Sequence, residues 1–352
     1  MQTQKPKIIV APLNWGIGHA TRCVPVINDL IKKGFEPIIC SDGNALQYLK
    51  KEFATIKTYT LPSYAIKYAK KGYLLKLKLL FQVPKIKKVI KAEHKVIQQI
   101  IKKENIKGII SDNRFGVYST KIPSVYITHQ LNVFSGITTF LTSKIHQRIM
   151  DNFKEIWIPD SKKQNLSGDL SKSDNKQGKT KFIGVLSRFQ NSVVQTIKFE
   201  QELLVLLSGT EPQRTILEHK LRLELNNYTK KVLFVRGKIN TKSQLKNTDN
   251  ITFVNFLEQE DLFKSIVNSK FVIARSGYST IMDLAVLQKK CFFIPTPGQT
   301  EQEYLAKNLE QLKISPFSTQ NKFKIALLDT MVNYTGFNTD ILNVNLDFSI
   351  FE

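Results

Sequence analysis

The chain has 352 residues, of which 42% are hydrophobic and 10% aromatic, enough apolar material for two cores of ordinary size. This composition excludes an intrinsically disordered chain. The formal net charge is +23, from 52 Lys and Arg against 29 Asp and Glu, so we expect an anionic partner: a nucleic acid, a phosphate-bearing substrate or an anionic membrane.

Cysteine usage and the start of the chain bear on the compartment. Cys23, Cys40 and Cys291 are odd in number and widely spaced among apolar residues, which predicts neither a disulfide framework nor a zinc site. The first residues, MQTQKPK, lead directly into an apolar strand, and no apolar run approaches the ~18 residues of a membrane span. We therefore expect a cytoplasmic protein without signal peptide or transmembrane helix.

The first strand opens the most informative segment, Ile8 to Gly34: an apolar strand, a glycine turn and an amphipathic helix beginning near Ala20. Gly16 and Gly18 let the backbone approach a ligand, and the helix start offers unpaired N–H groups, which together predict an anion-binding turn. The turn lacks the third glycine of G-x-G-x-x-G, and no acidic residue follows at the distance expected for a dinucleotide ribose. A nicotinamide cofactor is therefore disfavoured.

Short β-branched runs alternate with longer helical patterns along the whole chain. The predicted strands are 8–10, 37–40, 108–111, 124–128, 155–159 and 182–184, then 203–209, 231–237, 251–256, 270–277 and 290–295. This rhythm predicts two doubly wound α/β domains with parallel sheets, separated by the end of the first sheet near 184. The polar stretch from Asn165 to Lys181 predicts an exposed loop. Ligands bind beyond the carboxyl ends of such strands, so we expect a cleft between the domains to hold the site.

Polar residues follow the predicted strands of the first half. His19 and Arg22 fall on the first turn of the helix, and SDNRFG (111–116) and THQLN (128–132) each end a strand. Asp112 is a candidate to orient His19 or to act as a base itself, and it can equally be an Asx-type cap. His129 is a candidate for an acceptor or phosphate contact, or is simply a strand-end histidine.

A second strand-turn-helix occupies residues 271–290. Ser276 and Gly277 end its strand, and Ser279 and Thr280 open a helix that carries Asp283. Asp283 can accept hydrogen bonds from vicinal hydroxyls such as those of a ribose, or merely favour the positive end of the helix. The next segment carries Gln299, Glu301, Gln302 and Glu303, which suit a hydroxyl-rich sugar or form a solvated helix start.

At RSGYSTIMD (275–283) and FIPTPGQTEQEY (293–304), the chain resembles the GT-B glycosyltransferases of family 28, which include the peptidoglycan N-acetylglucosaminyltransferase and plant galactolipid synthases. The resemblance spans both domains. It implies that Ser276 and Gly277 hold a diphosphate, Asp283 the uridine ribose, and Gln302 with Glu303 the transferred sugar. The family usually has glutamate at 283 and glutamine at 303, which leaves UDP-GlcNAc and a UDP-hexose as alternative donors.

Weaker matches complete the expected donor site. Phe256 and Leu257 match the segment whose backbone pairs with uracil, and Ser208, Gly209 and Arg236 match turns that line the phosphate pocket. The full set of expected donor-binding residues is Gly18, Ser208, Gly209, Arg236, Phe256, Leu257, Arg275, Ser276, Gly277, Ser279, Thr280, Asp283, Gln299, Gln302 and Glu303.

The glycine turn of the first half also resembles the family's, which ends in histidine. Gly16, Gly18 and His19 match, while Asn14, Trp15 and Ile17 replace further glycines. His19 is accordingly a candidate general base for an acceptor hydroxyl, a brace for the diphosphate, or a structural histidine. The expected acceptor or phosphate contacts are Asn14, Arg22, Arg114 and His129.

The sequence contains no Asp-X-Asp triplet, a motif with which many sugar-nucleotide enzymes hold a divalent metal. We expect metal-independent transfer, with no cofactor besides the nucleotide-sugar co-substrate and with helix N-termini stabilising the leaving group. Direct attack by the acceptor inverts the anomeric centre, as the resemblance also implies.

Thirteen lysines lie between Lys67 and Lys107, against two glutamates. Bulky apolar residues alternate with them, which predicts contact with an anionic bilayer through Lys70, Lys71, Tyr73, Leu74, Leu75, Lys76 and Lys78. The alternative is a lysine-rich decoration of ordinary helices. Nucleic acid is not expected, because arginines are few and no RNA-binding or helix-turn-helix signature accompanies them.

We therefore expect a cytoplasmic enzyme, peripheral on the inner face of the membrane. Residues 1–188 form an acceptor domain, 198–334 a nucleotide-sugar domain, and 335–352 a tail returning to the first domain. The expected reaction transfers a sugar from a UDP-sugar to a hydroxyl of a lipid-linked or amphiphilic acceptor. The alternatives are a UDP-sugar 2-epimerase of the same fold and a non-catalytic basic protein that binds membranes or nucleic acid.

Overall fold

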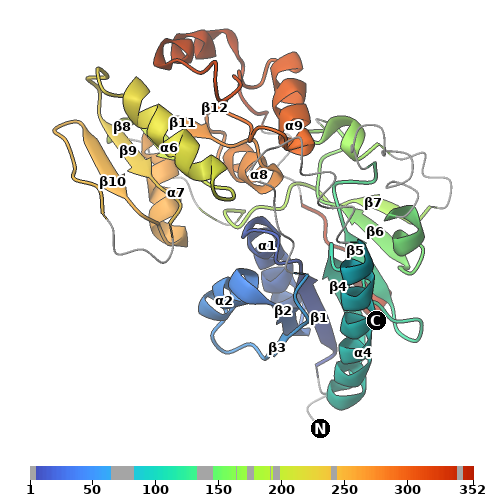
Figure 1. Cartoon of the computed structure of the whole chain (residues 1–352). Helices are drawn as coiled ribbons and strands as arrows, with labels where there is room; N and C mark the ends of the chain where they lie inside the picture. Colours follow the sequence, from blue (N-terminus) through green and yellow to red (C-terminus); the bar gives the residue numbers. More distant parts are fainter. Residues whose placement is uncertain are drawn as a thin grey trace. The chain divides into compact units, whose positions relative to one another are not determined.

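The computed structural model describes residues 5–64, 83–132, 146–163, 165–172, 178–190, 192, 199–238, 244–338 and 344–352. The chain divides into two compact units (Figure 1). Of the described residues, the first unit holds those up to Gln190 and those from 344 onward, and the second holds those from 192 to 338.

The first unit is built on a parallel sheet of seven strands in the order β3-β2-β1-β4-β5-β6-β7. The strands are β1 Lys7–Pro12, β2 Glu36–Ser41, β3 Thr58–Thr60, β4 Ile106–Asp112, β5 Ser124–Ile127, β6 Glu155–Ile158 and β7 Thr180–Phe182. The central strands are buried along nearly their whole length, which is why they read as continuous apolar runs rather than alternating patterns.

Helices cover both faces of this sheet (Figure 1). On one face, α1 (Gly18–Lys32) and α2 (Gly43–Glu52) pack against Ile8, Val10 and Ile39. On the other face, α4 (Val83–Glu104) packs its Ile97 and Ile100 against Ile9 and Ile109. The side chains of successive residues in a strand point to opposite faces, so one apolar run supplies both cores.

The end of the chain belongs to the core of the first unit. Phe348 and Phe351, the latter in the short 3₁₀ segment η6 (Ser349–Phe351), pack in the same cluster as α1 and α2. The backbone N–H of Asn345 donates to the carbonyl of Ile183 over 3.0 Å. A Cβ added at Gly108 would lie 2.2 Å from the Phe351 ring, so that glycine makes room for the ring.

The second unit has a parallel sheet of five strands in the order β10-β9-β8-β11-β12. Its strands are β8 Gln201–Leu206, β9 Val232–Val235, β10 Ile251–Val254, β11 Ser269–Ala274 and β12 Cys291–Phe293. Its helices are α6 Gln213–Glu224, α7 Gln259–Val267, α8 Tyr278–Val286 and α9 Thr300–Gln311, followed by the 3₁₀ segment η4 Ile325–Asn333. Leu217 and Leu221 of α6 join Phe323 and Leu328 over one face of the sheet.

The two predicted parallel sheets are confirmed, with three local differences. Strand β3 was not predicted, because Thr58–Thr60 lies at the edge of the sheet, is not fully buried and forms no apolar run. Strand β7 covers Thr180–Phe182 rather than the predicted 182–184. The prediction of an exposed loop between Asn165 and Lys181 is wrong for Leu166 and Ser167, which are buried, while Asp169 and Lys172 are exposed. The buried carboxylate of Asp160 accepts backbone N–H bonds from both buried residues, at 3.2 and 2.7 Å, and so draws the segment inward.

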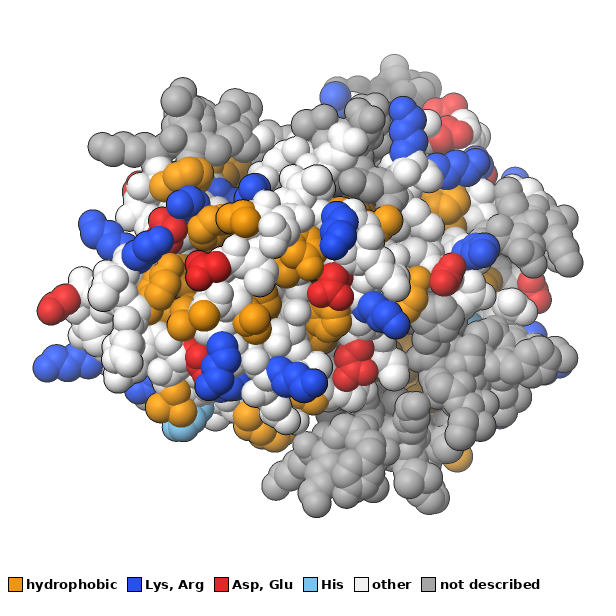
Figure 2. Space-filling view, turned by 90° about the horizontal axis from the view of Figure 1, so that it is seen from above, with side chains coloured by type: hydrophobic (Ala, Val, Ile, Leu, Met, Phe, Trp, Pro, Cys, Tyr) orange, Lys and Arg blue, Asp and Glu red, His pale blue; other side chains and the backbone are white. Residues whose placement is uncertain are grey.

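Charge is spread unevenly over the described surface. On the face in Figure 2, Lys and Arg side chains are interspersed with Asp and Glu among apolar groups. Helix α4 concentrates positive charge along one element. Its seven lysines are all exposed: Lys85, Lys87, Lys88, Lys91, Lys95, Lys102 and Lys103. Among the described helices, none has the length and hydropathy that a bilayer-spanning segment requires.

Candidate functional site

Each sheet has one point where its strand order reverses, and the candidate site residues gather there. In the first unit this point lies between β1 and β4, with Pro12 paired to Asp112 in the register. In the second unit it lies between β8 and β11, with Leu206 paired to Ala274. Connections leave such a pair toward opposite faces, and the crevice beyond the carboxyl ends is where doubly wound sheets bind ligands. We refer to the two crevices as the first and second half-sites.

The first half-site holds a histidine, a carboxylate and an arginine in mutual contact. Nδ1 of His19, on the first turn of α1, lies 3.0 Å from Oδ1 of Asp112 at the end of β4. Nε of Arg22 donates to Oδ2 of the same carboxylate over 2.6 Å, and Nη2 of Arg22 donates to Oδ1. The Arg22 and Asp112 side chains are 2% and 0% exposed, whereas His19 retains 15%. The imidazole is therefore the accessible member.

Arg22 also constrains the protonation of two imidazoles. Its Nη1 lies 3.1 Å from Nδ1 of His129, and a guanidinium can only donate. Nδ1 of His129 is thus the acceptor, and the proton of the neutral ring sits on Nε2. Nη2 of Arg22 also lies 2.9 Å from Nδ1 of His19, so that nitrogen can either accept from Arg22 or donate to Asp112.

The charge of Asp112 is stabilised despite its burial. Burial by itself raises the pKa of the carboxyl, but the neighbouring Arg22 and His19 outweigh it and hold the pKa well below its ordinary value. A carboxylate with so low a pKa is a poor proton acceptor near neutral pH. The observed geometry favours orientation of His19 over direct action by Asp112 as a base.

The expected acceptor contacts Arg114 and Asn14 are engaged within the protein. Arg114 is 0% exposed and donates to Glu93 over 2.5 Å, to Asp42 over 2.6 Å and to the Pro62 carbonyl over 2.8 Å. Nδ2 of Asn14 donates to Asp42 over 3.1 Å. The structure therefore contradicts direct contact between Arg114 and a ligand, because this ion-pair cluster encloses the guanidinium and fixes the loop after β4. The motif SDNRFG could not indicate these partners, because Glu93 and Asp42 lie far from Arg114 in the sequence.

The second half-site is built from two turns and a helix start. Ser208 and Gly209 follow β8 and are exposed, with Gly209 at φ +100°. Helix α8 begins after Gly277 without a side-chain cap, and the positive end of its dipole suits an anionic ligand. The Ser276 hydroxyl donates to the carbonyl of Gln302 over 2.8 Å and ties this turn to the start of α9. Ser279 and Thr280 lie in the first turn of α8 and are partly exposed.

Two arginines expected to bind the donor lie beneath the surface. Arg236 is 4% exposed, with Nε 2.9 Å from Glu218 and Nη1 2.8 Å from Asn255. Arg275 is 1% exposed and donates to the carbonyls of Ile294 and Pro295, each over 3.0 Å. Both guanidinium groups bind the backbone or neighbouring side chains of the carboxyl-end loops. The sequence motifs identified the segments that hold Arg236 and Arg275. They could not show whether each side chain is exposed to a ligand or buried beneath the loops.

The remaining expected donor residues surround the same turns. Asp283 lies in α8 and is 5% exposed. Oε1 of Gln302 accepts from the Thr296 N–H over 2.9 Å, and its Nε2 donates to Gln299 over 2.6 Å. Oε1 of Glu303 accepts from the Gly298 N–H over 2.9 Å. These α9 side chains thus shape the loop after β12. Phe256 and Leu257, between β10 and α7, are partly exposed, as is Gly18 at the start of α1.

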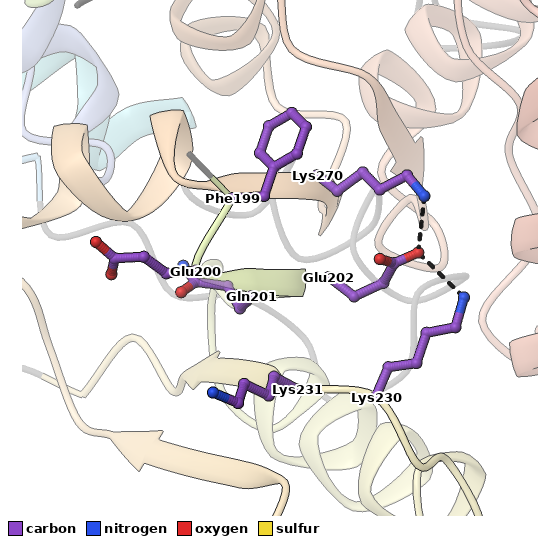
Figure 3. A pocket seen from close by; sticks show the side chains of 7 residues that line it. All are labelled: Phe199, Glu200, Gln201, Glu202, Lys230, Lys231 and Lys270. Carbon is purple, nitrogen blue, oxygen red and sulfur yellow. Dashed lines mark hydrogen bonds and ion pairs between the residues drawn. The ribbon is translucent and has the colours of Figure 1, made fainter. Parts of the chain in front are cut away.

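One pocket of the second unit lies away from the half-sites. Figure 3 shows a pocket of about 430 Å³ at the amino ends of β8, β9 and β11, where the Glu202 carboxylate lies 3.2 Å from both Lys230 and Lys270. Ligands of parallel α/β sheets bind at the opposite, carboxyl ends. This pocket is therefore not a candidate for the half-site chemistry. The expected membrane residues, from Lys70 to Lys78, lie outside the described residues.

Comparison with known proteins agrees with this architecture. A solved glycotransferase of kitacinnamycin superimposes with a TM-score of 0.66 over 94% of this chain and 90% of its own, at 12% identity. The fold is GT-B: two doubly wound parallel α/β units, as the sequence predicted.

Sequence similarity identifies the domain type of the second unit. Residues 203–335 match the glycosyltransferase family 28 C-terminal domain. An uncharacterized glycosyltransferase of Methanosarcina acetivorans is 25% identical over 87% of this chain and 83% of its own length. The UDP-N-acetylglucosamine–N-acetylmuramyl-(pentapeptide) pyrophosphoryl-undecaprenol N-acetylglucosamine transferase of Haemophilus influenzae is 23% identical over 56% of each chain. The chain is a GT-B glycosyltransferase whose second unit is a family 28 C-terminal domain.

Proposed function

We propose that the chain transfers a sugar from a UDP-sugar to the hydroxyl of an acceptor, with inversion at the anomeric carbon and without a metal ion. The observation that carries this proposal is the 3.0 Å contact between His19 and the buried Asp112 in the first half-site. In the proposed tautomer, Nδ1–H of His19 donates to Asp112, whose two oxygens also accept from Arg22. That tautomer leaves Nε2 unprotonated and able to act as a base.

The proposed step moves one proton and one sugar. Nε2 of His19 takes the proton of the acceptor hydroxyl while its oxygen attacks the anomeric carbon, and the bond from that carbon to the UDP oxygen breaks. Asp112 stabilises the imidazolium that results. The negative charge developing on the diphosphate is stabilised by the positive end of the helix dipole at the start of α8 and by the turn at Gly209.

Two observations support an amphiphilic acceptor at an anionic surface. The Haemophilus influenzae relative is named for a pyrophosphoryl-undecaprenol acceptor. In this chain, α4 exposes seven lysines along one helix, and each lysine near an anionic bilayer contributes about 1 kcal/mol of attraction. We propose that the first unit binds its acceptor at such a surface.

The deciding experiment measures UDP release by the purified chain from a panel of UDP-, GDP-, CDP- and dTDP-sugars, with and without amphiphilic acceptors and with EDTA present. Release that requires both a UDP-sugar and an acceptor, and that continues in EDTA, supports the proposal. Release from UDP-GlcNAc alone with formation of a 2-epimer indicates an epimerase. Binding to anionic vesicles with no response to any nucleotide indicates a non-catalytic membrane protein.

Sedimentation with vesicles tests the surface separately. The wild type should bind vesicles containing phosphatidylserine and ignore pure phosphatidylcholine. A Lys87→Glu, Lys91→Glu, Lys95→Glu variant should bind several-fold less, while the opposite result, unchanged binding, would remove α4 from the membrane surface. A matched triple charge reversal on α6 and α7, Lys220→Glu, Arg222→Glu and Lys264→Glu, controls for net charge alone.

A further inference from the structure

Two buried polar groups of the second half-site lack hydrogen-bond partners among the described residues. The Thr296 side chain is 3% exposed, and its hydroxyl has no partner. Arg275 is 1% exposed, and its Nε has none either. Buried polar atoms in folded proteins are almost always hydrogen-bonded. Two such atoms without partners at the carboxyl end of a sheet, where ligands bind, point to a ligand that supplies a partner.

The two groups belong to one local structure. Nη1 of Arg275 donates to the carbonyls of Ile294 and Pro295, the two residues that precede Thr296. The Thr296 N–H in turn donates to the Gln302 side chain over 2.9 Å. The backbone on both sides of the threonine is therefore held, and its hydroxyl is presented from a rigid loop.

The hydroxyl faces the glycine turn after β8. A Cβ added at Gly209 would lie 3.8 Å from Oγ1 of Thr296, the one described atom beyond the neighbouring residues of the turn within 4 Å of it. Gly209 has φ +100° and is exposed. The turn that the proposed donor diphosphate would contact thus lies directly beside an unsatisfied donor group.

The local charge has the sign that an anion requires. Every acceptor of Arg275 is neutral: three backbone carbonyls, including that of Gln213 at 2.9 Å, and the side-chain oxygen of Gln320 at 2.7 Å. No carboxylate pairs with it in the described ranges, and burial lowers its pKa to about 10. A buried cation without a counter-ion is stabilised when an anion binds nearby.

We propose that the Thr296 hydroxyl donates a hydrogen bond to the diphosphate of the nucleotide sugar, above the positive charge of Arg275. This inference rests on the proposed function and adds a phosphate-binding residue to it. Recognition then depends on a phosphate oxygen next to the Gly209 turn rather than on the nucleoside. Removing the hydroxyl should therefore weaken phosphate-bearing ligands and leave the nucleoside unaffected.

The test compares Thr296→Val, which keeps the shape, with Thr296→Ser, which keeps the hydroxyl, in the full chain. UDP affinity is measured by titration calorimetry, and uridine affinity by ligand-observed NMR, which detects weak binding. We expect Thr296→Val to lose about tenfold in UDP affinity, the size of one hydrogen bond to a charged group, with uridine binding and Tm unchanged. Thr296→Ser should retain UDP affinity. Thr330→Val controls for the loss of a threonine hydroxyl that is already bonded, to the Leu327 carbonyl over 2.6 Å.

The outcomes separate the inference from the function on which it rests. A wild-type chain that binds neither UDP nor another nucleotide overturns both. A wild-type chain that binds UDP, with Thr296→Val equal to it, overturns the inference and leaves the function standing. Equal losses of UDP and uridine affinity, or a loss shared by Thr296→Ser, also overturn it, since they indicate a distorted loop.

Discussion

The two half-sites occupy the same topological position in their sheets, yet their charges are arranged in opposite ways. In the first, the buried Asp112 carboxylate is surrounded by the cation of Arg22 and by His19. In the second, the buried Arg275 has only neutral acceptors among the described residues. The hydrogen bonds of Asp112 and Arg22 restrict where the neighbouring histidines carry their protons. Arg275, which has no charged partner among the described residues, is stabilised when an anion binds nearby. This difference is what the proposed function requires, since it assigns proton transfer to the first half-site and the charged leaving group to the second.

The largest effect should come from removing the proton acceptor. We expect His19→Ala to lower kcat for sugar transfer by about 10²–10⁴-fold, the usual contribution of a general base, with little change in UDP affinity. Stopped assays of UDP release, paired with calorimetry, measure both quantities. His219→Ala, at an exposed position of α6, is the matched control. A His19→Ala enzyme with near-normal kcat would leave the histidine as a brace or a structural residue.

Removing the charge of Asp112 should lower the free energy of unfolding of the first unit. Asp112→Asn leaves the guanidinium of Arg22 buried without its charge partner, which we expect to cost about 3–5 kcal/mol in the free energy of unfolding. Asp29→Asn, whose carboxylate pairs with Lys33 at 3.3 Å on the surface, should cost far less. Urea unfolding at neutral pH measures the difference, and equal losses for the two variants would contradict the role given to the buried pair.

The lowered pKa of Asp112 predicts that the stability of the folded chain depends on pH. The pKa of Asp112 is lower in the folded chain than in the unfolded chain, so its contribution to stability is complete above the unfolded value of about 3.9. That contribution declines as the pH falls toward the folded pKa. Wild-type stability should therefore drop more steeply below about pH 4 than that of Asp112→Asn. Parallel curves for the two proteins would argue against a lowered pKa.

A substitution in the tail, residues 344–352, should change the stability of the first unit without changing UDP affinity. Phe348→Ala removes a ring that is 3% exposed and packs near Phe35 and Trp157, which we expect to destabilise the first unit by about 3–5 kcal/mol. UDP affinity, which we assign to the second unit, should stay within about twofold of the wild type, because the ring belongs to the core of the first unit. Thermal unfolding and calorimetry check both parts. Ser349→Ala, an exposed neighbour, is the control.

The smallest effect should come from the expected ribose contact. Asp283→Asn retains the shape of a side chain that is 5% exposed in α8, and we expect about a tenfold loss of UDP affinity, as for one charge-assisted hydrogen bond. Asp261→Asn in the first turn of α7 carries the same change at an exposed helix start. If the two variants bind UDP alike, Asp283 serves the helix rather than the nucleotide.

Much of the architecture follows from local pattern. The apolar β-branched runs, from 8–10 through 290–295, located all the strands except β3, with β7 displaced by two residues, because a strand buried on both faces must be apolar throughout. The glycine turn before His19 and the turn at Gly277 were likewise visible, since turns that bind anions need glycine and a helix start. These features depend on residues that are neighbours in the chain.

What the sequence by itself determined is therefore the two sheets, the two turns and the residue types at them. Only the tertiary structure decided which side chains meet: His19 contacts a carboxylate 93 residues away, and Arg114 is enclosed by Glu93 and Asp42 rather than offered to a ligand. Thr296 lies within the motif at 293–304, but nothing in the motif indicated that its hydroxyl would lack a hydrogen-bond partner and lie beside Gly209. The physical reason is that local periodicity sets which face of a strand is apolar, while strand order and register set the neighbours of its polar end.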